Sequence, residues 1–143
     1  MRLLYLKRCC FLLAPFFFIA FAAAAGPILV PPDKQDGNSW YRLVFVTTIT
    51  RDATSTDIAD YDAFVKIATG LSPELWALGL TWRAIVSTDT VSAPTQIGAF
   101  PEPIYNLAGQ LVRKPSADLW DGSLETPIMF DEMGNERWTN VWT

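Results

Sequence analysis

The first 25 residues decide which side chains remain to build a fold. They carry three basic residues within the first eight positions, continue as an uncharged run over 9–25, and end in four alanines. A basic start, a short apolar run and a small-residue cleavage site are the features of a secretory signal peptide. The sequence therefore predicts that 1–25 is a signal peptide cut after Ala24 or Ala25, and that the export machinery binds the precursor.

The alternative for this segment is an uncleaved membrane anchor. A membrane-spanning helix needs about 20 strongly apolar residues, whereas the run over 9–25 is shorter, contains Pro15 and tails off into alanine. We therefore expect cleavage, and a secreted protein that is extracellular or resides in the cell envelope.

Cleavage changes the chemistry that is open to the mature chain. Both cysteines of the protein, Cys9 and Cys10, leave with the signal peptide, and the chain contains no histidine. A disulfide, a zinc site of Cys/His type and a His-dependent nucleophilic triad are then excluded. The remaining residues, about 118, form one domain of ordinary size. All six tryptophans lie in this part, and we expect aromatic packing to supply much of its core.

The charge balance bears on the partners of the mature chain. After loss of the signal peptide, eight basic residues face 15 acidic ones, for a net charge of −7. An acidic domain without a basic patch argues against nucleic acid or an anionic membrane surface as a partner.

The first half of the mature chain shows a strand and two helices. Residues 26–39 are rich in proline and polar residues, which predicts an extended, poorly ordered leader. Residues 40–48 are aromatic and β-branched, which favours a strand buried on both faces. An N-cap cluster at 54–57, followed by apolar residues at helical spacing, predicts a helix that ends at Gly70. Ser72 and the proline after it predict a second, short helix, which Gly79 stops.

The second half shows only short strands and loops. Alternating residues at 81–88 favour a strand, and the following prolines favour a long loop over 89–103. The remaining predicted elements are a hairpin over 104–112, a turn over 117–122, a strand over 127–130, a turn over 131–136 and a last strand over 138–143. This order predicts one α+β domain over 40–143, with two early helices and an irregular antiparallel sheet.

Several of these segments together carry a family resemblance. They are YRLVFVT at 41–47, an Ala59-Asp60-x-x-Ala63 pattern, LTWRAIVST at 80–88, PIY at 103–105, DLWDG at 118–122 and VWT at 141–143. The chain resembles bacterial secreted proteins of the PEP-CTERM type and, distantly, bacterial surface domains with a C-type-lectin-like (endostatin-like) fold. The resemblance implies a C-type-lectin-like fold for 40–143 and says nothing about chemistry.

The chain departs from this family pattern in two places. Members usually continue beyond the VWT element into a glycine-containing segment, and many then carry a Pro-Glu-Pro sorting tail, which the sequence lacks. We therefore expect either a C-terminally truncated member or a protein that is released rather than anchored. The calcium ligands of lectins are matched only loosely, at 102–104 and 138–140, without the Asn and Asp residues those motifs need.

The acidic residues of the second half are candidate ligands or catalysts. They are Asp118, Asp121, Glu125, Asp131 and Glu132. Carboxylates of this kind bind Ca²⁺, which takes six to eight oxygen ligands. The sequence contains no Asp-x-Asp-x-Asp-Gly loop. We therefore favour the interpretation that these residues form turns or solvated loops, and we expect no cofactor. A pair of carboxylates also serves glycoside hydrolysis, and this reading is kept as an alternative.

Trp120 and Asp121 are the best candidates for ligand binding. They lie in a polar turn, where an indole ring could stack on a sugar, although a tryptophan in such a turn more often covers the core. We expect a non-catalytic extracellular or cell-surface protein that binds a glycan or another matrix ligand. The alternatives are a polysaccharide-active hydrolase that uses acidic residues and a truncated structural fragment.

Overall fold

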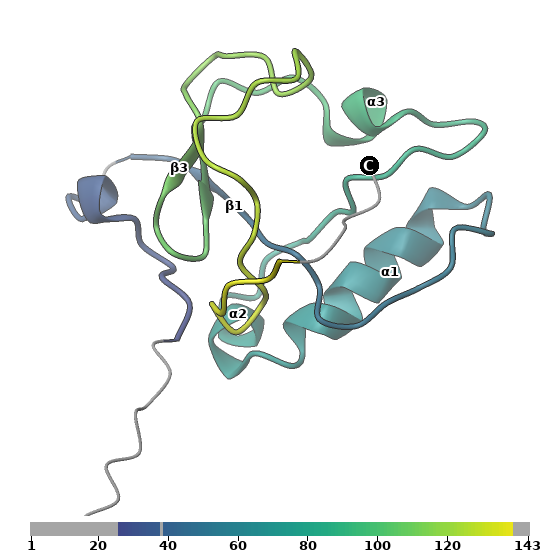
Figure 1. The fold of residues 1–143 in the computed structure, drawn as a ribbon, viewed down its shortest axis with the longest axis horizontal. Helices are drawn as coiled ribbons and strands as arrows, with labels where there is room; N and C mark the ends of the chain where they lie inside the picture. Colours follow the sequence, from purple (N-terminus) through teal and green to yellow (C-terminus); the bar gives the residue numbers. More distant parts are fainter. Residues whose placement is uncertain (1–25, 38, 139–143) are drawn as a thin grey trace, which may run out of the picture.

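A computed structural model describes residues 26–37 and 39–138 as a small α+β fold. In chain order its elements are the 3₁₀ helix η1 (Pro32–Lys34), β1 (Arg42–Val44), α1 (Ile58–Thr69), α2 (Pro73–Ala77), α3 (Ala93–Ile97), β2 (Ile104–Asn106) and β3 (Leu111–Arg113). Figure 1 shows the sheet and α1 at opposite sides of the molecule. The α+β class is as predicted.

The sheet is mixed, which corrects the expected antiparallel arrangement. Its strand order is β1-β2-β3, with β1 parallel to β2 and β2 antiparallel to β3. Leu43 lies opposite Tyr105, and Tyr105 lies opposite Leu111. The pairing of β1 with β2 is parallel because all three α-helices intervene in the chain, and a long crossover is what parallel neighbours need.

The core is centred on β2. All three residues of β2 are buried, and Leu107, just after it, is 1% exposed. By contrast, β1 is a short edge strand with Arg42 exposed and the next two residues half-buried. The prediction of a long strand over 40–48, buried on both faces, was therefore wrong, because only its middle pairs with the central strand.

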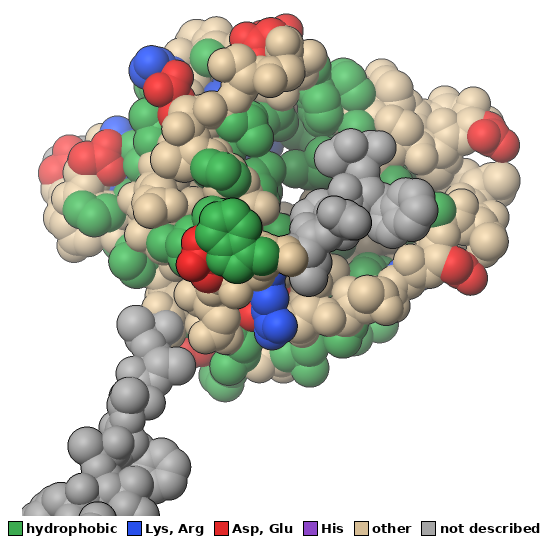
Figure 2. Space-filling view, in the orientation of Figure 1, with side chains coloured by type: hydrophobic (Ala, Val, Ile, Leu, Met, Phe, Trp, Pro, Cys, Tyr) green, Lys and Arg blue, Asp and Glu red, His purple; other side chains and the backbone are tan. Residues whose placement is uncertain are grey.

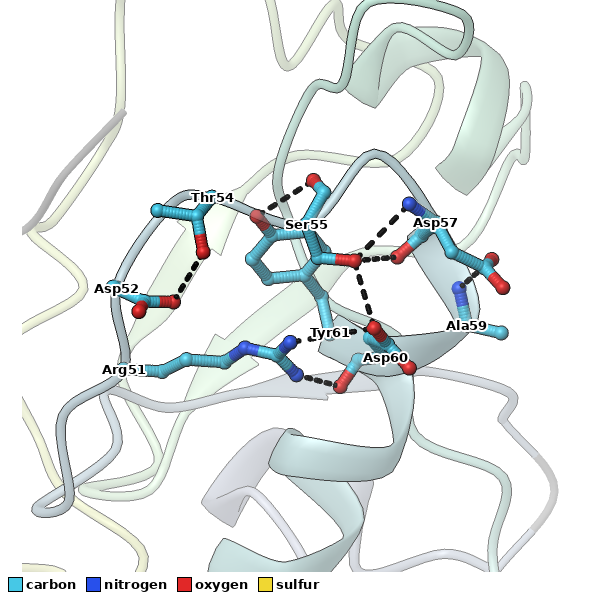
Figure 3. A network of polar contacts seen from close by, with 8 residues as sticks. All are labelled: Arg51, Asp52, Thr54, Ser55, Asp57, Ala59, Asp60 and Tyr61. Atoms are coloured by element: carbon cyan, nitrogen blue, oxygen red, sulfur yellow. Dashed lines mark hydrogen bonds and ion pairs between the residues drawn. The ribbon is translucent and has the colours of Figure 1, made fainter.

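The N-terminus of α1 forms as the sequence indicated. The Asp57 carboxylate accepts a hydrogen bond from the Ala59 N–H at 2.9 Å, which caps one of the free amides of the first turn. Ser55 donates to the Asp60 carboxylate at 2.7 Å and Arg51 pairs with the same group at 3.4 Å (Figure 3). The hydrogen bond from Ser55 and the Arg51 charge outweigh desolvation and lower the pKa of Asp60. The predicted apolar face is the buried one, with Tyr61 and Ala68 in the core.

The two short helices have the same N-terminal signal. In α2 the Ser72 hydroxyl accepts from the Leu75 N–H, and in α3 the Ser92 hydroxyl accepts from the Thr95 N–H, with a proline in the first turn of each. The first of these helices was predicted and the second was not. Helix α3 lies inside the segment expected to be a loop over 89–103. It is as short as α2, but its first turn lacks the acidic residue that marked the start of α2.

Residues 81–88 are extended but are not a strand in the described part of the chain. Their side chains alternate as predicted, with Trp82 and Ala84 turned inward and Arg83 and Ile85 exposed. However, the Ala84 N–H donates to the Asp62 carboxylate of α1 at 2.8 Å instead of to a neighbouring strand. The alternation therefore indicates that one side of this segment is buried, not that the segment belongs to a sheet.

The hairpin and the tight turns were predicted correctly. Strands β2 and β3 are joined by a turn in which the Asn106 side chain accepts from the Ala108 and Gln110 N–H groups at 3.1 and 3.0 Å. Residues 127–130 contribute only an isolated bridge between Phe130 and Glu136, not a strand. The last predicted strand, over 138–143, lies outside the described residues except for its first residue.

The proline-rich segment at 26–37 is placed against the sheet, where the sequence had indicated poor order. The Ile28 N–H donates to the Leu107 carbonyl at 2.8 Å, and the Tyr41 hydroxyl donates to the Leu29 carbonyl at 2.8 Å. The Tyr105 hydroxyl donates to Asp33 at 2.5 Å. Burial, followed by this hydrogen bond and the Asp33 charge, raises the pKa of Tyr105 to about 12.

Most of the described tryptophans lie on the surface rather than in the expected aromatic core. Four of them are exposed, namely Trp40, Trp76, Trp120 and Trp138. Trp82 is half-buried and packs edge-on against Phe45 with a ring separation of 5.2 Å. Figure 2 shows hydrophobic side chains on the face of the molecule that is turned to the viewer. Within the described residues no helix is long and apolar enough to span a bilayer.

Candidate functional site: a cleft beside β3

A cleft of about 560 Å³ opens between two chain segments that approach each other at the end of β3. One wall is 98–101 and the other is 116–120, with Pro94 of α3 and Arg113 of β3 completing the lining. Clefts of about 300–1,000 Å³ with apolar walls and a few polar groups are typical of small-molecule sites. It is larger than the hollow between α1 and α2 that is described below.

Arg113 holds the two walls together. Its side chain is buried, and it donates to the carbonyl oxygens of Phe100 at 3.0 Å, Glu102 at 2.8 Å and Ala117 at 2.6 Å. The Phe100 carbonyl belongs to the first wall, the Glu102 carbonyl lies just beyond it in the chain, and the Ala117 carbonyl belongs to the second wall. A rigid planar guanidinium presents its donors in a fixed fork, so this one side chain ties both walls of the cleft to the end of β3.

The Phe100 ring of the first wall is oriented by two cations. The Arg113 guanidinium carbon lies 4.5 Å from the ring centroid, and that of Arg42 lies 3.8 Å from it. Arg42 is anchored in turn by Glu102, with Nε and Oε2 3.4 Å apart. Cation–π contacts of this kind are worth about 0.5–2 kcal/mol each, and they favour one ring orientation.

The second wall is built on a tight backbone. Ser116 has a φ of 56°, the left-handed region that non-glycine residues seldom occupy, and its N–H donates to the Pro101 carbonyl of the first wall at 3.0 Å. Two residues on, the Asp118 carboxylate accepts from the Trp120 N–H at 2.9 Å. This turn places the Trp120 side chain, 40% exposed, in the lining of the cleft. Local strain of this kind is often found at binding sites.

Two polar groups in the lining are left for a ligand. Neither the Ser116 hydroxyl nor the second carboxylate oxygen of Asp118 has a hydrogen-bond partner among the described residues, and both side chains are exposed. The cleft thus combines an accessible indole, a hydroxyl and a carboxylate with apolar walls.

The structure separates the two predicted ligand-binding residues. Trp120 lines the cleft, whereas Asp121 does not. The Asp121 carboxylate accepts from the Ser123 N–H at 2.8 Å and closes a turn with Gly122, the role given to it by the Asp-Gly pair. Sequence reasoning did not single out Phe100 or Arg113, because nothing local to a strand residue shows that three distant carbonyls will gather around it.

The acidic residues of the second half do not gather into a site. The Glu125 carboxylate pairs with Lys114 at 2.8 Å, Asp131 pairs with Arg137 at 2.7 Å, and Glu132 is buried with its carboxylate accepting from the Thr48 N–H at 2.9 Å. In the part of the chain that the structure describes, no three acidic, histidine or cysteine side chains are close enough to hold a metal ion together.

Asp131 has a structural environment instead. Burial raises the pKa of its carboxyl, but the hydrogen bonds from the Asn135 amide, Arg137 and the Met133 amide outweigh burial and lower the pKa below its usual value. The carboxylate accepts from both backbone amides at 2.9 Å. It therefore organises the turn over 131–136 that the sequence predicted.

A second hollow of about 420 Å³ lies between α1 and α2. Its lining is almost entirely apolar, with Ile67 and Trp76 both exposed and Lys66 as its single charged residue among the described side chains. It offers no carboxylate or hydroxyl to orient a polar ligand, so the Arg113 cleft is the stronger candidate.

The described residues form a small α+β fold with an aromatic cleft beside β3. Comparison with known proteins adds no relative, because no family model, no curated protein and no solved structure matches this chain. The inference of function consequently rests on the residues of the cleft.

Proposed function

We propose that this protein is a non-catalytic, exported protein of the cell surface or extracellular matrix that binds a glycan in the Arg113 cleft. The observation that carries the proposal is the exposed Trp120 indole in the same cleft as the Ser116 hydroxyl and the Asp118 Oδ2, neither of which has a hydrogen-bond partner among the described residues. A pyranose ring presents polarised C–H groups on its faces and hydroxyls at its edge. The negative face of an indole suits the former, and hydroxyl and carboxylate oxygens suit the latter.

Export and fold type belong to the same proposal. The basic and apolar N-terminal segment supports secretion. A C-type-lectin-like fold, within the family of secreted PEP-CTERM-type proteins, is the finer form of the proposal, supported by the sequence motifs and by the small α+β architecture.

Binding rather than hydrolysis is favoured by the carboxylates of the cleft. Glycoside hydrolysis generally uses two carboxyl groups that flank the scissile bond, and Asp118 is the single carboxylate in the described lining. The nearby Glu102 is engaged by Arg42.

The test is glycan binding by the chain without its predicted signal peptide, residues 26–143. A glycan array identifies ligands, and calorimetry measures the affinity of the wild type and of Trp120→Ala. We expect the substitution to weaken binding at least about tenfold, equivalent to about 1.4 kcal/mol. Trp76→Ala is the matched control, because Trp76 is also exposed but lies in the other hollow. Equal affinities for the two variants would remove the cleft from the proposal.

A further inference from the structure

The charges around the cleft specify the kind of glycan, an inference that rests on the proposed function. Asp118 is exposed, lines the cleft and forms no ion pair among the described residues. Its Oδ1 accepts from the Trp120 N–H, and its Oδ2, which accepts no hydrogen bond among the described residues, can act only as an acceptor.

The cation of the cleft has no free donor for a ligand, although its donation to neutral carbonyls leaves its positive charge in place. Arg113 is 6% exposed, and its Nε, Nη1 and Nη2 all donate to backbone carbonyls of the walls. A guanidinium that is committed in this way supports the protein rather than a ligand.

We propose that the cleft selects neutral glycans and rejects those with uronic acid or sulfate groups, and that Asp118 is the specificity-determining residue. A neutral sugar donates its hydroxyls to the Asp118 carboxylate, and a charge-assisted hydrogen bond of this kind is stronger than one between neutral groups. An anionic sugar places a like charge against Asp118, which is unfavourable, and it finds no free guanidinium donor in the lining with which to form a compensating ion pair.

The chain contains a matched control for Asp118. Both Asp118 and Asp121 are exposed, and each accepts a hydrogen bond from the amide two residues later, at 2.9 and 2.8 Å respectively. Only Asp118 lines the cleft. Asparagine retains an oxygen acceptor for this turn and removes the charge. Asp118→Asn therefore removes a charge inside the cleft, and Asp121→Asn removes a charge from a similar turn outside it.

The experiment measures binding of residues 26–143 to two sets of oligosaccharides of equal length. One set is neutral, made of glucose, mannose, xylose or N-acetylglucosamine units, and the other is made of galacturonate or mannuronate units. We expect the wild type to bind a neutral ligand at least tenfold more tightly than any uronate. Asp118→Asn should weaken the affinity for neutral ligands about fivefold and reduce the ratio of neutral to uronate affinity at least fivefold. Asp121→Asn should leave the affinities for neutral ligands and for uronates within twofold of the wild type. Melting curves of the two variants report whether the fold is intact.

Each outcome decides between the two proposals. A wild type that bound uronates as tightly as neutral sugars, and lost both affinities on Trp120→Ala, would overturn the selectivity for neutral glycans but support the cleft as the glycan site. Equal effects of the Asp118 and Asp121 substitutions would overturn the role of Asp118. Binding of neither set would refute the proposed function itself, and with it this inference.

Discussion

Replacement of Arg113 by methionine tests whether one buried cation builds the cleft. Methionine is similar in length and apolar, so the change removes the donors while leaving much of the packing. The carbonyls of Phe100, Glu102 and Ala117 would all lose the guanidinium that now lies 2.6–3.0 Å from them.

The magnitude follows from opposing contributions. Hydrogen bonds from a charged group are worth about 1.5–3 kcal/mol each, and the cation–π contact with Phe100 adds about 0.5–2 kcal/mol. Burying the guanidinium charge costs several kcal/mol, which methionine recovers. We therefore expect Arg113→Met to lower the free energy of unfolding by about 3 kcal/mol and the Tm by roughly 10 °C.

The assay is urea unfolding of residues 26–143, followed by tryptophan fluorescence. Arg113→Lys should lie between the wild type and Arg113→Met, because an ammonium retains the charge but not the planar fork. Arg83→Met is the control, since exposed Arg83 donates to a single carbonyl, of Gln96, at 2.9 Å, and its loss should cost less than about 0.5 kcal/mol. If Arg113→Met were no less stable than Arg83→Met, the view of Arg113 as the residue that ties the walls together would be refuted.

Two further predictions concern the contact between the N-terminal segment and the body of the domain. Folding raises the pKa of Tyr105 from its usual 10.0 to about 12, so the contribution of Tyr105 to stability is complete below pH 10 and is lost as the pH rises toward 12. An alkaline absorbance titration should therefore show one tyrosine that ionises at higher pH than the others, and Tyr105→Phe should abolish this step. A wild type without such a step would contradict the prediction. Gly134 has a φ of +79°, and a Cβ there would lie 2.9 Å from the Pro27 backbone, whereas Gly122 has a φ of +81° with nothing within 4 Å. Thermal melts should therefore show Gly134→Ala to be less stable than Gly122→Ala by at least about 1 kcal/mol, because both variants carry backbone strain and only the first also clashes; equal stabilities would show that Gly134 does not approach the segment.

Where the sequence alone succeeded, the decisive interactions are local. The caps of α1 and α2, the hairpin turn at Asn106 and the Asp121-Gly122 corner are each made by residues within five positions of one another. Such side-chain-to-backbone bonds depend on residue type and spacing, so they are legible in the chain itself. Helix α3 was missed although its Ser92 cap was present, because the sequence lacks the first-turn acidic residue that follows the proline in the equally short α2.

The tertiary structure alone decided what depends on long-range pairing. Residues 81–88 alternate like a strand, yet their backbone bonds to Asp62 of a helix, and β1 pairs in parallel with a strand about 60 residues later. Chain composition could not show that the proline-rich segment would lie against Leu107. Nor could it show that Arg113 would bond to carbonyls of both walls, so that Trp120 and Phe100 line one cleft. The sequence by itself determined that residues 26–143 contain no cysteine or histidine and carry a net negative charge. The cleft exists only because folding brings segments that are far apart in the chain to the same buried cation.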